Sequence, residues 1–290
     1  MKQLRAYLEL ARPLHWVKNA FVLAGVIFGH AWDDPDTLAA ALLATVAFCL
    51  ASSATYAFND CLDAEQDRDH PDKRDRPIAR GAVSAHEGYA ISAILALVSL
   101  GIAAYAGPVA AAIVAVYLVL NLGYTLGLKR VPVVDVFVIA SGFMLRLLAG
   151  TSGIGVEPSQ WLLACGFLLT LFLGFAKRRA ELARLARVAA QHRAVLDAYT
   201  TGFLDKAILV CAVGMIVTYA LYTVSPGTAA LHGTAHLIVT LPWVLLGTFR
   251  YLFRLHFRGG GGDPAEELFR DPVLALAGVG WIATVLWLIW

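Results

Sequence analysis

The sequence has few charged residues. Asp, Glu, Lys and Arg make up only 15% of its 290 residues, whereas about 25% is typical of a soluble domain. Instead, 59% of the residues are hydrophobic, and the mean hydropathy is +0.68. This composition excludes an ordinary soluble protein. The small net charge of +2 gives no support for a nucleic-acid partner, so we expect a membrane and no nucleic acid.

Cysteines are also scarce. Cys49, Cys61, Cys165 and Cys211 have no paired spacing and lie in or beside apolar runs. This pattern predicts small buried side chains and argues against disulfides or a cysteine metal cluster.

Long apolar runs dominate the rest of the sequence. Runs of about 18 to 22 residues recur, and each is long enough to cross a hydrocarbon core of about 30 Å. We predict nine membrane spans at residues 14–31, 38–58, 88–106, 108–127, 132–152, 159–176, 203–224, 235–256 and 272–290. Short links join these spans, so we expect an all-α integral membrane protein with a single domain over residues 1–290.

The basic residues predict the orientation of these spans. Of the 23 Lys and Arg residues, all but Arg146 fall at or next to the connections on one side of the predicted membrane. Connections on the cytoplasmic side carry the excess of bases in membrane proteins. The N-terminus and every charged loop are therefore expected in the cytoplasm.

A dense group of acids and bases follows the second predicted span. In a continuous helix Asp60, Asp63 and Asp67 would lie within an arc of roughly 60°. Three carboxylates on one stripe repel each other unless a cation lies between them, and oxygen ligands facing water suit Mg²⁺. The alternative is a solvated acidic helix start, which is mildly favourable.

A basic arm comes directly after these aspartates. Its bases are Lys73, Arg74, Arg76 and Arg80. Pro71 and Pro77 break the helix here, and the bases suit phosphate oxygens. A solvated loop that follows the cytoplasmic bias of bases is the alternative. That bias explains the bases but does not explain the regular aspartates beside them, so we favour a metal–phosphate site.

Other charged segments are less specific. The turn at Lys129 and Arg130 suits either a phosphate or a plain inner loop. In the fifth predicted span, Asp135 and Arg146 lie three helical turns apart on nearly the same face. An ionisable residue within a span suggests function, although Arg146 could equally pair with a buried carbonyl or acid, or extend outwards to the membrane interface. The glycine run at 259–262 fits either a mobile lid or a loose connection.

The aspartate motif resembles a known family. The pattern Asn59-Asp60-x-x-Asp63-x-x-x-Asp67 at the end of the second span resembles the first aspartate motif of the UbiA-type prenyltransferase superfamily. Four further segments resemble its decaprenyl-phosphate phosphoribosyltransferase branch: Arg12-Pro13-x-x-Trp16-x-Lys18-Asn19, residues 69–81, Gly142-Phe143-x-x-Arg146 and Lys177-Arg178-x-Ala180-Glu181. The resemblance implies nine helices around a central cavity open to the cytoplasm.

The resemblance also implies an activity and a set of site residues. The enzyme would transfer 5-phosphoribose from phosphoribosyl pyrophosphate to a polyprenyl phosphate, with Mg²⁺ as cofactor. Asp60, Asp63 and Asp67 would be catalytic and bind the metal. The substrate-binding residues would be Lys18, Asn59, Lys73, Arg74, Arg76, Tyr124, Lys129, Arg146, Lys177, Arg178 and Glu181.

One departure from the wider superfamily favours this branch. Members that prenylate aromatic rings carry a second aspartate-rich motif near the inner end of the sixth span. Here that place reads Lys177-Arg178-Arg179-Ala180-Glu181. A site that holds a pyrophosphate, a 5-phosphate and a lipid phosphate needs cations more than a second metal. A polyprenyltransferase for an aromatic or other small acceptor is the alternative.

A transporter is a more distant alternative. Transporters usually place polar groups near the middle of the membrane, whereas here only Arg146 lies deep. By resemblance we expect a bacterial inner membrane. The sequence leaves open a monomer or a homo-oligomer, the length of the polyprenyl chain and the fate of the product.

Overall fold

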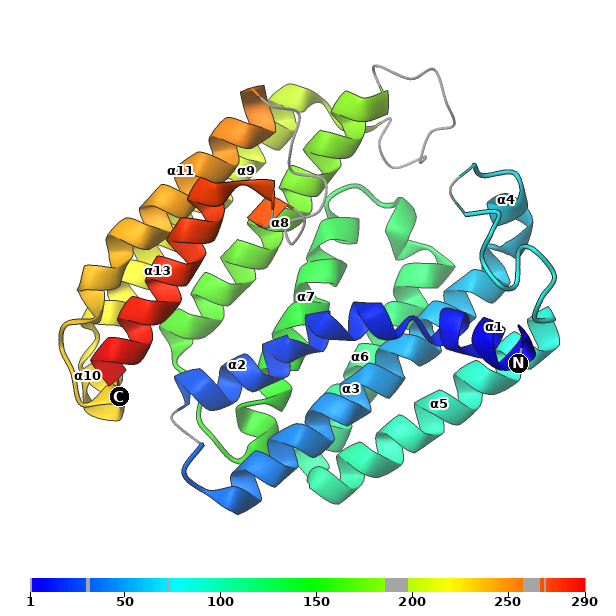
Figure 1. Cartoon of the computed structure of the whole chain (residues 1–290), viewed down its shortest axis with the longest axis horizontal. Coiled ribbons are helices and arrows are strands. Elements are labelled where there is room, and N and C mark those ends of the chain that lie inside the picture. The colour runs from blue at the N-terminus through cyan, green and yellow to red at the C-terminus, as the bar shows by residue number, and fades with distance from the viewer. Residues whose placement is uncertain are drawn as a thin grey trace. The chain divides into compact units, whose positions relative to one another are not determined.

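The computed structural model describes residues 2–29, 32–71, 73–185, 198–257, 267–268 and 270–289. Within these ranges the chain forms helices and turns and no β-strand (Figure 1). The longer helices are α3 (Pro35–Leu62), α5 (Ala85–Ala106), α6 (Pro108–Leu126), α7 (Val134–Ala149), α8 (Gln160–Leu185), α9 (Thr201–Val224), α11 (Leu241–Phe257) and α13 (Pro272–Ile289). The shorter ones are α1 (Lys2–Ala11), η1 (Pro13–Asn19), α2 (Ala20–Phe28), α4 (Ala64–Arg68), η2 (Leu128–Arg130), η3 (Ser152–Ile154), α10 (Pro226–His232) and η5 (Leu237–Thr240).

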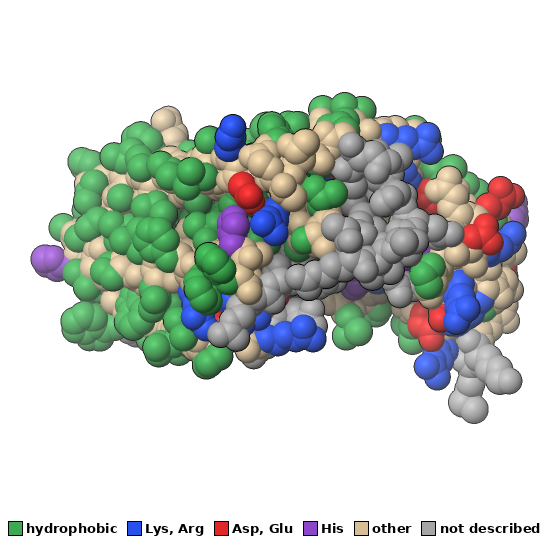
Figure 2. Space-filling model, turned by 90° about the horizontal axis from the view of Figure 1, so that it is seen from above, with side chains coloured by type: hydrophobic (Ala, Val, Ile, Leu, Met, Phe, Trp, Pro, Cys, Tyr) green, Lys and Arg blue, Asp and Glu red, His purple; other side chains and the backbone are tan. Residues whose placement is uncertain are grey.

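Eight helical segments in the described ranges are long and apolar enough to cross a membrane. They coincide with the second to ninth predicted spans, and α8 continues beyond the predicted end at 176 to Leu185. Apolar side chains cover much of the surface (Figure 2); Val119 is 70% exposed and Trp287 is 78% exposed. Such a surface suits lipid rather than water. The prediction of an all-α integral membrane protein is confirmed.

The first predicted span has a different local structure. A 3₁₀-helix, η1, leads into the nine-residue α2, so this segment is not one long α-helix. Polar residues interrupt its apolar character: Asn19 is fully buried, and its Nδ2 donates to Ser52 Oγ at 3.3 Å. Since a 3₁₀-helix rises about 2.0 Å per residue, η1 and α2 together would still reach about 27 Å. The count of nine spans therefore stays a prediction.

The chain divides into two compact units. The first comprises Met1–Leu128 and Gly142–Pro158, and the second comprises Lys129–Ser141 and Ser159–Trp290. Helix α7 contributes residues to both units. The prediction of a single domain over 1–290 stays a prediction, and the glycine run at 259–262 lies outside the described residues.

The first unit is built around α3. Small side chains recur along one face of this helix and are all buried: Ala41, Ala44, Ala47, Ala51 and Ala54. Small residues let helices of membrane proteins approach closely, and α3 packs along α5. The Ser92 hydroxyl of α5 donates to the Ala54 carbonyl of α3 at 2.8 Å. This hydrogen bond helps to fix the position of α5 along α3.

The basic arm is folded back on the N-terminal helix. Ile78 and Val83 of the arm are buried in one cluster with Leu10 of α1 and Ala57 of α3. The arm ends at a capping box in which Ser84 and Glu87 satisfy each other's backbone N–H groups at the start of α5. These apolar anchors hold the arm, and with it the arm's bases, beside the C-terminal end of α3.

The second unit packs α8 along α9. Phe172, Phe175, Leu204 and Ile208 are buried in its core. Arg250 and Arg254 of α11 both bind the buried carboxylate of Asp271, which also accepts hydrogen bonds from the backbone N–H groups of Val273 and Leu274 at the start of α13. These charged hydrogen bonds hold the pKa of Asp271 well below its usual range. The ion pairs fasten α13 to α11.

Candidate active site

Asp60 lies near the C-terminal end of α3 and is only 2% exposed. Nη2 of Arg12 donates to both carboxylate oxygens, at 2.6 and 2.7 Å, and Nη1 of Arg76 donates to Oδ1 at 3.1 Å. Burying a carboxylate is costly unless it is paired and hydrogen-bonded. The two guanidinium groups therefore supply the opposite charge and the hydrogen bonds that this buried carboxylate requires.

Asp67 is the second buried carboxylate of this cluster. It lies in the short helix α4, is 2% exposed, and accepts from Arg76 Nη1 at 2.7 Å. Lys73 Nζ lies 3.8 Å from its Oδ1. A single nitrogen, Arg76 Nη1, thus lies between Asp60 and Asp67. Of the arm's bases, Lys73 and Arg76 therefore lie beside these aspartates.

Asp63 is directed differently because the helix does not continue. Helix α3 ends at Leu62, and Asp63, with φ −90° and ψ 4°, joins it to α4. The Asp63 carboxylate accepts from Asn59 Nδ2 at 3.0 Å. The continuous helical stripe that we expected is therefore broken at its middle member. Asp60 and Asp67 both accept from Arg76 Nη1, whereas Asp63 accepts from Asn59 of α3.

Sequence reasoning missed Arg12 as a site residue. It precedes Pro13 and has a positive φ of 52°, which is uncommon for a residue other than glycine. Its guanidinium also lies over the Tyr56 ring, 5.0 Å from the centroid. The Arg12-Pro13 pair of the N-terminal motif carried the only sequence signal, and nothing in it linked Arg12 to an acid 48 residues away.

The donor chemistry of this cluster suits a divalent ion. Asp60 and Asp67 present carboxylate oxygens, which Mg²⁺ prefers, and both already surround one positive charge. No group of three or more His, Cys, Asp or Glu side chains in the described ranges is arranged to hold a metal. The carboxylate of Asp63 is instead hydrogen-bonded to Asn59. The three-aspartate ligand set stays a prediction.

The remaining predicted substrate-binding residues are placed as follows. Lys18 of η1, Arg74 of the arm and Lys177 of α8 are exposed, while Tyr124 of α6 and Lys129 of η2 are partly buried. Lys129 and Lys177 belong to the second unit and the others to the first. Their role towards a substrate stays a prediction.

Arg146 is buried within the first unit. It is 6% exposed, and its guanidinium donates to Asn19 Oδ1 at 2.7 Å, to the Gly142 carbonyl and to the Tyr117 hydroxyl. No acid in the described ranges forms an ion pair with it. Of the readings that the sequence left open, the structure shows pairing with a buried carbonyl. Its hydrogen bond to Asn19 holds α7 to η1. The assignment of Arg146 to substrate binding stays a prediction.

Arg178 and Glu181 form a buried polar cluster in the second unit. Arg178 Nε donates to Asp135 Oδ2 at 2.7 Å, and Nη1 donates to Glu181 Oε2 at 2.6 Å. Tyr199 donates to Asp135 Oδ1 at 2.8 Å. Asp135 is fully buried and Arg178 is 2% exposed. Asp135 and Arg146, expected on nearly the same face of one helix, therefore have separate partners.

Tyr199 gives a test of this cluster. Its hydroxyl also accepts from the Val133 backbone N–H, and burial raises its pKa to about 12. A raised pKa stabilises the fold below the unfolded value of about 10, and this contribution is lost as the pH rises through about 12. We expect Tyr199→Phe to lower stability by about 1 to 3 kcal/mol at neutral pH, and by less at strongly alkaline pH.

Thermal melting of the detergent-purified protein at neutral and alkaline pH measures this effect. Tyr105→Phe is the control, because Tyr105 is 84% exposed on a membrane-spanning helix. Equal melting temperatures for Tyr199→Phe and Tyr105→Phe at neutral pH would show that the hydroxyl contributes nothing.

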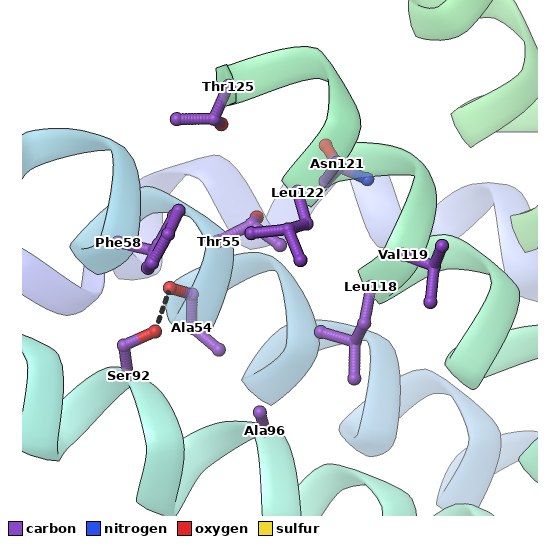
Figure 3. Close-up of a pocket in the computed structure, with 10 residues that line it drawn as sticks. All are labelled: Ala54, Thr55, Phe58, Ser92, Ala96, Leu118, Val119, Asn121, Leu122 and Thr125. Atoms are coloured by element: carbon purple, nitrogen blue, oxygen red, sulfur yellow. Dashed lines mark hydrogen bonds between the residues drawn. The ribbon is translucent and has the colours of Figure 1, made fainter. Parts of the chain in front are cut away.

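An apolar cavity of about 210 Å³ lies between α3, α5 and α6 of the first unit. Its ten lining residues include Phe58, Leu118 and Leu122 and no charged side chain (Figure 3). The Ser92 hydroxyl at its wall is bonded to the Ala54 carbonyl (Figure 3). With walls of this kind the cavity suits hydrocarbon and does not suit a phosphorylated sugar.

These features define a class of protein: a helical membrane protein with paired buried carboxylates among arginines at the end of a spanning helix. The model of the UbiA prenyltransferase family matches residues 19–270, and the chain belongs to this family. It is 34% identical over 289 residues to the decaprenyl-phosphate phosphoribosyltransferase of Mycolicibacterium smegmatis, covering 96% of this chain and 90% of the relative.

A second relative and a solved structure agree. The chain is 33% identical to the decaprenyl-phosphate phosphoribosyltransferase of Corynebacterium glutamicum, with 95% of this chain and 84% of the relative covered. A UbiA homolog from Archaeoglobus fulgidus bound to GPP and Mg²⁺ has the same fold, with a TM-score of 0.71 at 18% identity, covering 98% of this chain and 99% of that one. The predicted resemblance to the UbiA superfamily and its phosphoribosyltransferase branch is confirmed.

Proposed function

We propose that this protein transfers 5-phosphoribose from phosphoribosyl pyrophosphate to a polyprenyl phosphate. The observation that carries this proposal is the identity of 33–34% to decaprenyl-phosphate phosphoribosyltransferases over 95–96% of the chain. In this proposal the buried carboxylates and the basic arm would supply the groups that the reaction needs.

The residues of the arm would bind the donor. Lys73 and Arg76 already lie beside the buried carboxylates, and Arg74 follows Lys73 on the same turn. Guanidinium groups bind phosphate oxygens in a planar fork, and lysine binds them as a point charge. These side chains would orient the diphosphate and stabilise the negative charge that develops on it as it leaves.

Asp60 and Asp67, with Asp63, would hold Mg²⁺. Bound there, the ion would neutralise charge on the departing diphosphate. The bond between ribose C1 and the pyrophosphate oxygen breaks, and an oxygen of the lipid phosphate forms the new bond to C1 from the opposite face, with inversion. The acceptor is already anionic at neutral pH, so no general base is needed. The protein would act chiefly by positioning and electrostatics.

The site would face the cytoplasm from a bacterial inner membrane. The bases at alternate connections of the sequence support this orientation. A water-soluble donor would then enter from the cytoplasm while the acceptor stays in the bilayer. This arrangement gives a physical reason for performing sugar transfer within a membrane-embedded fold.

A comparison of substrates tests the function. We expect purified protein with Mg²⁺ to convert radiolabelled phosphoribosyl pyrophosphate and polyprenyl phosphate into a lipid-soluble product, and to lose this activity with a chelator. The same protein should not condense a polyprenyl diphosphate with an aromatic acid. Product only in that second reaction would favour the alternative, a UbiA-type polyprenyltransferase for an aromatic or other small acceptor. Release of pyrophosphate in detergent, where no compartments exist, separates either enzyme from a transporter.

A further inference from the structure

Arg12 is hydrogen-bonded to the Asp60 carboxylate, which the proposed metal would need as a ligand. It binds both oxygens of Asp60, while Arg76 binds Oδ1 of Asp60 and Oδ2 of Asp67. Both carboxylates are 2% exposed, so little of their surface is open to another ligand. A divalent ion that binds Asp60 must therefore replace at least part of the contact with Arg12.

Electrostatics makes this replacement unfavourable without an anion. Three cationic side chains, Arg12, Arg76 and Lys73, lie within 4 Å of the two carboxylates. A divalent ion would add two positive charges to a site where these cationic side chains already neutralise both carboxylates. Repulsion between the ion and these side chains is weakly screened in a buried site. A diphosphate brings enough negative charge to accept the displaced guanidinium groups.

Arg12 is placed to make such an exchange. Its side chain is 19% exposed, against 2% for its partner Asp60, so Arg12 is the more accessible member of the pair. The ring of Tyr56 beneath it offers a surface over which the cation stays stabilised as its hydrogen bonds change. Its Nη2 contact with Asp60 is a pair of charge-assisted hydrogen bonds, for which phosphate oxygens are an equivalent acceptor.

We propose that Arg12 is an exchangeable counter-ion: it holds Asp60 in the resting protein and moves to the diphosphate when a divalent metal takes its place. Metal and diphosphate then bind cooperatively, and each is weak alone. The inference rests on the proposed function only in requiring a diphosphate donor, whether its other part is phosphoribosyl or prenyl.

Manganese binding tests the exchange without any turnover. Mn²⁺ would be titrated into purified protein and followed by electron paramagnetic resonance, with and without inorganic pyrophosphate. For the unmodified protein we expect pyrophosphate to tighten Mn²⁺ binding by about tenfold or more, after correction for the Mn²⁺–pyrophosphate complex. For Arg12→Gln we expect tighter Mn²⁺ binding without pyrophosphate, by about fivefold, and a smaller gain on adding it.

Arg5→Gln is the matched control. It removes the same charge from the neighbouring helix α1, where Arg5 pairs with Glu9 and its side chain is 83% exposed, and should bind Mn²⁺ like the unmodified protein. Arg12→Lys keeps the charge but not the planar guanidinium. Its Mn²⁺ affinity should lie between those of Arg12→Gln and the unmodified protein. Mn²⁺ binding by Arg12→Gln that is no tighter than in the unmodified protein would overturn the proposal.

Two further readouts separate the causes of failure. If Arg12→Gln does not purify as a folded protein, Arg12→Lys must still show a smaller effect of pyrophosphate, and an unchanged effect counts against the exchange. If the Mn²⁺ shifts occur as expected but phosphoribosyl transfer is absent, the counter-ion exchange stands and the proposed substrate is wrong.

Discussion

Asp60→Asn should lower phosphoribosyl transfer by about three orders of magnitude while the protein still folds and inserts. The amide keeps the size of the side chain but cannot hold a divalent ion as a carboxylate does. It also no longer neutralises Arg12 and Arg76, which are partly exposed at 19% and 24%, so water can solvate them. Initial rates with saturating Mg²⁺, together with melting temperatures in detergent, measure the two effects separately.

Glu65→Gln controls for the loss of one negative charge. Glu65 lies on α4 between Asp63 and Asp67 but is exposed. Its variant should keep nearly the full rate. Near-normal turnover in both Asp60→Asn and Asp63→Asn would remove the metal from the proposed function. Loss of turnover in Asp60→Asn, together with normal turnover in Asp63→Asn, would assign metal binding to Asp60 and Asp67.

Gly150→Ala should prevent stable folding of the first unit. A Cβ atom at this position would lie 1.7 Å from the carbonyl oxygen of Val22 in α2, and the reciprocal contact is also tight, since a Cβ on Gly25 would lie 2.4 Å from the Gly150 oxygen. In both cases the closest atoms belong to the backbone, which cannot rotate aside. Overpacking in a core typically costs about 1 to 3 kcal/mol, and a main-chain overlap should reach or exceed the top of that range.

Fluorescence-detected size-exclusion chromatography after graded heating measures this prediction. We expect Gly150→Ala to appear mainly as aggregate or to melt far below the unmodified protein. Gly101→Ala is the control: Gly101 lies exposed in the C-terminal part of α5, and apart from its own helix backbone and chain neighbours no atom lies within 4 Å of an added Cβ. Because alanine favours helix, this variant should melt at the same temperature or slightly higher. A Gly150→Ala protein as stable as Gly101→Ala would show that α2 and the backbone directly after α7 are less closely packed.

The two glycines illustrate what sequence reasoning could and could not reach. Apolar length located the spans well, because a hydrocarbon core imposes a minimum number of residues on any helix that crosses it. Apolar length does not indicate which helices pack against each other, because nearly every helix face is apolar. The close contact of Gly25 with Gly150 depends on two backbones meeting at residues 125 positions apart, and no local pattern encodes it.

The charged residues divide in the same way. The crowding of acids and bases at 59–80 predicted a polar site, because such a group is costly to bury unless it is paired. The helical stripe of Asp60, Asp63 and Asp67 was an extrapolation of α3 through Asp63, where the helix ends. The assignment of Arg178 to a substrate came from its motif and stays a prediction, and no local pattern indicated that its guanidinium pairs with the buried Asp135.

Hydropathy and motif spacing are properties of short segments, and from them alone the membrane environment, the spanning helices and the family of this protein follow. The partner of each charged side chain depends on how the helices pack. Arg12 meets Asp60, and Arg146 meets Asn19, across 48 and 127 residues. The energy of an ion pair depends on separation in space and on burial, and both come into being only when the helices pack.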